Sequence, residues 1–168
     1  KDGLTLYSHD IRIQKNSFDL ENNLGVELFR RGDVNTALSH FERSVTLQPK
    51  WSISNNNLGA TFEKIGDIKK ARFYYERATQ LSDYYLAYEN LAMLLVKNDA
   101  PEDALKLVNI ALSKFPQNGK INAAAAIVYY KLGKETEALT FARRALILGP
   151  SPFNSQLFQA ISNKTLDK

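Results

Sequence analysis

The sequence repeats itself with a period of 33 to 34 residues, and no other feature restricts the possible folds as strongly. The clearest column is one of alanines: Ala37, Ala71, Ala104 and Ala138. A second column of small residues follows seven positions later: Ser44, Ala78, Ala111 and Ala145. Further columns keep the same step: Gly32, Gly66, Asp99 and Gly133, and the prolines Pro49, Pro116 and Pro150. A fixed period in this range indicates an array of one small structural unit, stacked against its neighbours.

Each unit has the pattern of a helix, a turn and a second helix. Apolar residues recur at steps of three and four, as in Leu24 and Leu28 and then in Ala37, Phe41 and Val45, which is the period of an α-helix. The sequence therefore predicts an all-α chain of helix pairs.

The turns carry their own signals. In Gly32-Asp33 and Gly66-Asp67, glycine permits a positive φ and aspartate can cap the next helix through its side chain. In the third unit Pro101 stands where the second helix should begin, a position that tolerates its missing N–H.

A column of small residues on the first helices marks where the two helices of a unit approach closely: Gly25, Gly59, Ala92 and Ala126. We expect the alanines of the second helices, such as Ala37 and Ala71, to lie opposite this column. Larger residues beside it, such as Leu28 and Phe62, would fill the remaining space.

The helix pair with its Leu-Gly, aromatic, Gly-Asp, alanine and proline landmarks resembles the tetratricopeptide repeat. The repeats are assigned to residues 18–51, 52–84, 85–118 and 119–152, and two of them, the third and fourth, have Leu91-Ala92 and Ala125-Ala126 in place of Leu-Gly. The resemblance implies a tandem-repeat solenoid that winds as a right-handed superhelix. It leaves residues 1–17 and 153–168 outside the repeats.

These two terminal segments have apolar patterns of their own. Phe153, Leu157 and Ile161 recur every four residues, which predicts a helix that caps the last repeat. In the N-terminal segment Leu4, Leu6, Ile11 and Ile13 alternate with other residues, as an extended strip or a broken helix would. This segment either covers the first repeat or links it to an upstream domain, and an uncovered flank would favour homo-oligomers.

Composition and motifs argue against several classes of function. The 22 basic and 18 acidic residues are interspersed, so the net charge of +4 forms no nucleic-acid-binding run. The sequence has no cysteine, only His9 and His40 as histidines, no nucleophile elbow and no phosphate-binding loop. We therefore expect no enzyme, no metal or other cofactor and no membrane insertion, and the sequence does not indicate a cellular compartment.

In the family, the first helix of each repeat lines a concave groove that holds extended peptides, and the resemblance implies binding residues at the matching positions. Asparagines at the sixth position, Asn23, Asn57 and Asn90, carry both donors and acceptors for a peptide backbone. Further candidates on the same face are Asn22, Val26, Phe29, Asn56, Ala60, Met93, Ile127 and Tyr130. A row at the thirteenth position forms a basic edge: Arg30, Lys64, Lys97 and Lys131.

Some family members grip a C-terminal carboxylate of a chaperone with lysine, asparagine and arginine at set positions of this groove. Aligned on the first repeat, those positions hold Asn22, Val26, Asn57, Leu86 and Asn90. Aligned on the second, they hold Asn56, Ala60, Asn90, Lys120 and Ala124. Neither alignment reproduces the set, so an internal extended segment or a helix is the better expectation for the ligand.

The sequence thus predicts a non-catalytic scaffold that binds a protein or peptide. The chain begins at Lys1 rather than at a methionine, from which we expect a fragment. A second hypothesis is therefore an accessory or assembly domain of a larger enzyme or of a membrane-associated secretion or envelope complex. A third is a scaffold that assembles with itself.

Overall fold

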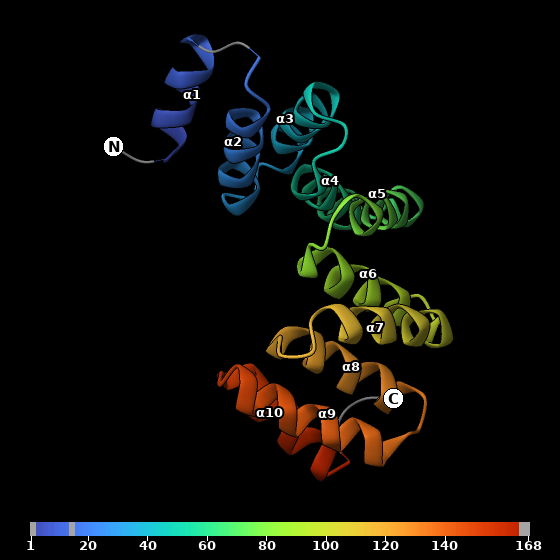
Figure 1. Cartoon of the computed structure of the whole chain (residues 1–168). Coiled ribbons are helices and arrows are strands. Elements are labelled where there is room, and N and C mark those ends of the chain that lie inside the picture. Colours follow the sequence, from blue (N-terminus) through green and yellow to red (C-terminus); the bar gives the residue numbers. More distant parts are fainter. Residues whose placement is uncertain (1–2, 14–15, 165–168) are drawn as a thin grey trace. The chain divides into compact units, whose positions relative to one another are not determined.

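In the computed structural model, which describes residues 3–13 and 16–164, the chain forms ten α-helices and no strand (Figure 1). The helices are α1 (Gly3–Ile13), α2 (Phe18–Arg30), α3 (Val34–Leu47), α4 (Ser52–Ile65), α5 (Ile68–Leu81), α6 (Tyr85–Lys97), α7 (Pro101–Lys114), α8 (Gly119–Lys131), α9 (Glu135–Leu148) and α10 (Pro152–Ser162). The predicted all-α helical-repeat class is confirmed.

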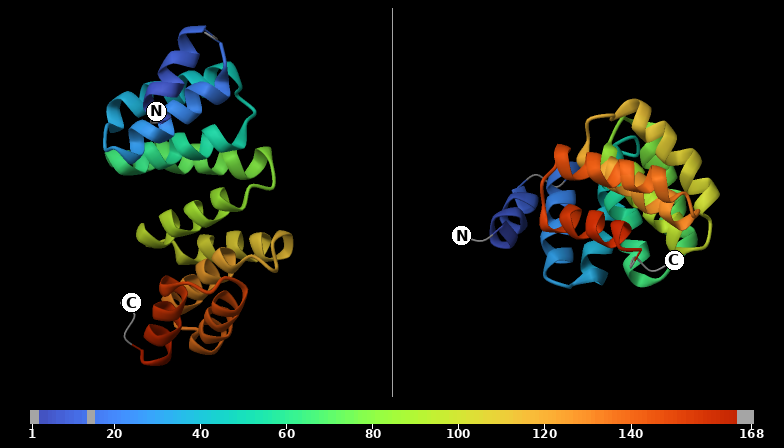
Figure 2. Two further views of the ribbon diagram at one scale, coloured as in Figure 1. Left: turned by 90° about the vertical axis from the view of Figure 1, so that its left-hand side faces the viewer. Right: turned by 90° about the horizontal axis from the view of Figure 1, so that it is seen from below.

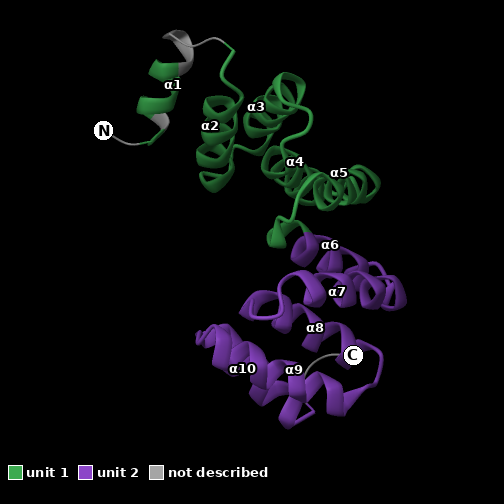
Figure 3. Ribbon diagram, in the orientation of Figure 1, with its two compact units in different colours: residues 1–87 green, residues 88–168 purple. Residues whose placement is uncertain are grey.

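The chain divides into two compact units, residues 1–87 and 88–168 (Figure 3). In the first unit, α2 packs on α3, α3 on α4, and α4 on α5. In the second, α7 packs on α8, α8 on α9, and α9 on α10. The turned views show the paired helices of each unit side by side (Figure 2). Each predicted repeat contains two successive helices joined by a short turn.

The turns have the geometry that their residues predict. Gly66 ends α4 with φ of +92°, and the Asp67 side chain accepts a 3.1 Å hydrogen bond from the backbone N–H of Lys70 at the start of α5. In the third repeat Asp99 takes the positive φ, and Pro101 is the first residue of α7.

The glycines on the first helices lie against aromatic rings on the second helices, Gly25 against Phe41 and Gly59 against Tyr75. A Cβ placed on Gly25 would come within 2.7 Å of the Phe41 ring, and one on Gly59 within 2.7 Å of the Tyr75 ring. Counting from the first residue of each repeat, these pairs occupy the eighth and twenty-fourth positions. The same two positions hold Ala92 with Val108 in the third repeat and Ala126 with Ala142 in the fourth, all four buried. The missing methyl group of glycine is thus matched by a larger partner, which keeps the helix spacing similar.

The first and last helices, α1 and α10, can be compared with the predictions for the two terminal segments. The backbone of α1 is helical and packs on α2, so the helix is the alternative that the structure adopts. Leu6 is exposed, whereas the side chains of Leu4, Ile11 and Ile13 lie outside the described residues. At the other end α10 packs on α9 and α8 and buries Leu157 and Ile161.

The expectation for Phe153 was wrong, because its side chain is 57% exposed. Its neighbour Asn154 is buried instead. The Asn154 amide donates to the carbonyl oxygens of Ala145 at 3.0 Å and Gly149 at 2.7 Å, which ties α10 to the end of α9. A polar anchor therefore fixes the start of this helix, and its apolar contacts begin one turn later.

Candidate functional site

A small pocket opens between the first helices of the first two repeats. It has a volume of about 130 Å³ and is lined by Val26, Phe29, Arg30, Phe41, Asn57 and Ala60. Val26, Phe29 and Arg30 come from α2, Asn57 and Ala60 from α4, and Phe41 from α3. A cavity of about 150 Å³ accepts a benzene molecule, so this pocket has room for one aliphatic side chain.

The close approach of α2 and α3 gives the pocket its floor. Because Gly25 has no side chain, the Phe41 ring lies directly against α2, and Phe41 is 2% exposed. The floor is therefore a rigid aromatic surface that belongs to the core. Val26 and Phe29 form the α2 wall and keep part of their surface exposed, so they can contact a ligand.

The asparagines beside the pocket are linked to one another. The Asn57 amide donates a 2.9 Å hydrogen bond to the Asn22 side-chain oxygen, which joins α4 to α2. The Asn56 amide lies 3.4 Å from the Asn57 side-chain oxygen. Asn22 and Asn56 are buried, whereas Asn23 and Asn57 are half-buried. The predicted row of amides thus helps to hold neighbouring repeats together, and only part of the row is presented to solvent.

The predicted binding residues of the second unit are divided between surface and core. Asn90 and Met93 on α6 and Ile127 on α8 are half-buried, and Ile127 packs against the core of α8, α9 and α10. Tyr130 is 1% exposed and lies within that core, so its ring is not presented at the surface.

All four residues of the basic edge are exposed: Arg30, Lys64, Lys97 and Lys131. In each case the residue lies in the last turn of the first helix of its repeat, where a cation also interacts favourably with the helix dipole. Arg30 has one guanidinium nitrogen 3.7 Å from the Glu27 carboxylate and lines the pocket described above.

Asparagines at the fourth position of the second and fourth repeats make a recurring contact that sequence reasoning missed. The Asn55 amide donates to the carbonyl oxygen of Pro49, and the Asn122 amide donates to that of Pro116. Arginines of the second helices reach the same acceptors, Arg77 to Pro49 and Arg144 to Pro116. The spacing between these asparagines and the prolines, six residues in both repeats, is a signal that could have revealed the contact.

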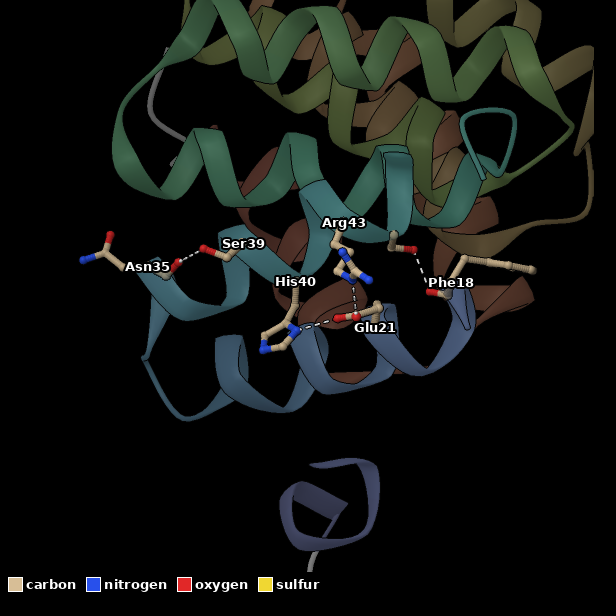
Figure 4. A network of polar contacts seen from close by, with 7 residues as sticks. Phe18, Glu21, Asn35, Ser39, His40 and Arg43 are labelled. Atoms are coloured by element: carbon tan, nitrogen blue, oxygen red, sulfur yellow. Dashed lines mark hydrogen bonds and ion pairs between the residues drawn. The ribbon is translucent and has the colours of Figure 1, made fainter. Parts of the chain in front are cut away.

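The first repeat replaces this arrangement with a charged cluster (Figure 4). Glu21 stands at the fourth position and is 3% exposed. His40 Nδ1 lies 2.7 Å from one Glu21 carboxylate oxygen, and Arg43 Nε donates to the other at 2.8 Å. Arg43 is the counterpart of Arg77 and Arg144. The cluster therefore ties α2 to α3, whereas in the second and fourth repeats the residues at these positions hold the preceding turn.

No helix in the described part of the chain is both long and apolar enough to cross a membrane. Within residues 3–13 and 16–164, histidine and acidic side chains do not gather in groups of three that would suit a metal ion.

The fold and the spacing of its landmarks define a protein built from helix-pair repeats. Models of the tetratricopeptide repeat match residues 53–85 and 89–154. The chain therefore belongs to the tetratricopeptide repeat family. Proteins built from these repeats are generally non-catalytic scaffolds that bind proteins or peptides.

Solved structures with the same fold include very different proteins. A chain of the APC/C hetero-tetramer Cut9-Hcn1 matches with a TM-score of 0.80 and 19% identity, over 94% of this chain and 32% of that chain. MamA matches with a TM-score of 0.72 and 20% identity, over 86% of this chain and 85% of that one. TTC0263, a thermophilic repeat protein of Thermus thermophilus, gives a TM-score of 0.77 and 18% identity, over 95% and 87%. No curated protein sequence matches the chain significantly. At these identities the likeness concerns the fold alone.

Proposed function

We propose that this chain is a protein-binding scaffold that holds an extended segment of its partner across α2 and α4, with one apolar side chain in the pocket between them. The observation that carries the proposal is the pocket itself. Five of its six lining residues are ones that the sequence predicts as binding or edge residues: Val26, Phe29, Arg30, Asn57 and Ala60.

The chemistry of the pocket favours a particular ligand. Its walls are apolar and its floor is the Phe41 ring, so an aliphatic side chain would lose contact with water there. Burial of such a side chain contributes about 1.5–3 kcal/mol. Arg30 at the rim favours an acidic group next to the apolar anchor, and Asn57 offers polar atoms to a peptide backbone.

A library of random twelve-residue peptides, selected on the wild-type chain, tests this proposal. The selected peptides should share an apolar residue, and they should lose affinity when the pocket is filled by Ala60→Phe. Ile65→Ser is the matched control, because Ile65 also lies on α4 and is 47% exposed but does not line the pocket. Selected peptides that bind the filled pocket as tightly as the wild type would refute this mode of binding.

A further inference from the structure

Two neighbouring columns of the repeats supply partners for each other. The fifth position holds Asn22, Asn56, Glu89 and Ala123, and the sixth holds Asn23, Asn57, Asn90 and Ala124. In the first unit the sixth-position Asn57 donates to the fifth-position Asn22 of the preceding repeat. This hydrogen bond requires an acceptor at the fifth position and a donor one repeat further on.

The pairing fails between the third and fourth repeats. Glu89 stands at the fifth position of the third repeat and offers a carboxylate, but the sixth position of the fourth repeat is Ala124, which has no side-chain donor. Consistently, Glu89 Oε2 is buried and has no hydrogen-bond partner among the described residues. An acceptor that folding leaves unpartnered destabilises the folded state, and the cost is larger for a charged group.

The surroundings of Glu89 make a cation its best partner. Burial raises the pKa of the Glu89 carboxyl, and Lys120 on α8 opposes this effect through its positive charge. Lys120 is exposed, and its charge does not supply the missing hydrogen bond to Oε2. A donor that also carries positive charge would satisfy the oxygen and offset the cost of burial together.

We propose that Glu89 is a recognition site for a basic side chain, lysine or arginine, of a peptide bound along α6 and α8 of the second unit. A ligand cation would donate to Glu89 as Asn57 donates to Asn22 within the chain. This inference rests on the proposed function, since it assigns a second contact to the same kind of ligand.

Small probes test this site without knowledge of the natural partner. Butylguanidinium and butylammonium imitate the two basic side chains, and butylurea is a neutral donor of similar shape. The carboxyl carbon of Glu89 is observed by NMR during titration with each probe. We expect a saturable shift with both cations, at least fivefold weaker binding of butylurea, and a lower pKa of Glu89 in the presence of butylguanidinium.

Two variants complete the experiment. In Glu89→Gln the shifts that the cations cause at the backbone amides of Asn90 and Ala124 should disappear, whereas Lys120→Met removes a competing cation and should strengthen binding. Equal response to butylguanidinium and butylurea, or an unchanged pKa of Glu89 with the cation present, would overturn the proposal. The pKa is measured in the wild type, so this outcome does not depend on a variant that folds.

The titration reports on the second unit only. If Glu89 does not bind the small cations, the proposal for the pocket between α2 and α4 still stands. If no peptide is selected, the predicted response of Glu89 to the small cations is unchanged. The two proposals can therefore fail separately.

Discussion

The side chain of Asn57 donates a hydrogen bond of 2.9 Å to the side chain of Asn22, thirty-five residues earlier in the sequence. Asn22 is 3% exposed, so this bond satisfies an acceptor that water reaches poorly. It connects the first helices of two successive repeats. An asparagine at the sixth position thus has a structural role in this chain, beside any contact that it makes with a ligand.

Removal of this bond should destabilise the first unit. In Asn57→Ala the buried Asn22 oxygen loses its donor, and we expect a loss of about 1–3 kcal/mol in the free energy of unfolding. A double-mutant cycle with Asn22→Ala, measured by urea denaturation, should give a coupling energy of about 0.5–1.5 kcal/mol. Simple additivity of the two single variants would contradict the role assigned to the pair.

The contact between Gly25 and Phe41 predicts an unusual response to alanine. Alanine favours a helix over glycine by about 1 kcal/mol, yet the added methyl group would come within 2.7 Å of the Phe41 ring. Overpacking of this kind costs about 1–3 kcal/mol, so Gly25→Ala should lower the thermal midpoint of unfolding. In a Phe41→Leu background the same change should become neutral or stabilising. If Gly25→Ala stabilises the wild type, the packing described for α2 and α3 is incorrect.

The cluster of Glu21, His40 and Arg43 predicts a stability effect of a different origin. Glu21→Ala removes two short hydrogen bonds to a buried carboxylate and should lower the free energy of unfolding by about 1–3 kcal/mol. The exposed pair of Arg72 and Glu76 is equally short at 2.7 Å and serves as the control. Arg72→Ala should cost about 1 kcal/mol or less, because water screens that pair. Similar losses for the two variants would argue against a special contribution from burial.

Glu89 predicts a dependence of stability on pH. Its pKa in the folded chain is raised above the ordinary value of 4.5, chiefly by burial. The folded state therefore holds the proton more tightly than the unfolded state, and stability falls as the pH rises from 4.5 through the raised pKa. Glu89→Gln keeps the shape without the charge, so it should raise the urea midpoint at about pH 7 more than at about pH 4. An effect that is the same at both pH values would contradict this assignment.

Most of the fold could be predicted from the repeat period and from the residues at the turns. Gly66 and Asp67 act through backbone conformation and one local hydrogen bond, and such local effects can be read from residue type and spacing. The sequence did not predict the pairing of Gly25 with Phe41 or of Gly59 with Tyr75. It depends on which side chains face each other across two helices, and the small-residue column alone does not identify the partner.

The candidate site was predicted in part for the same reason. The alignment of the repeats in the sequence predicted that Val26, Asn57 and Ala60 share one face. In the structure all three line one pocket. The same alignment placed Tyr130 on that face, but its ring turns into the core of the fourth repeat. Whether Glu89 has a partner depends on hydrogen bonds between repeats, and a single glutamate among asparagines carries no signal of them in the sequence.

The most direct test of the central claim is the dissociation constant of a peptide selected on the wild type, measured by titration calorimetry against the wild type, Ala60→Phe and Ile65→Ser. Far-ultraviolet circular dichroism and thermal melting establish that each variant is folded. We expect at least tenfold weaker binding to Ala60→Phe, which corresponds to about 1.4 kcal/mol, and less than a twofold change for Ile65→Ser. Equal affinity for the wild type and for folded Ala60→Phe would contradict the claim that the pocket between α2 and α4 holds the partner.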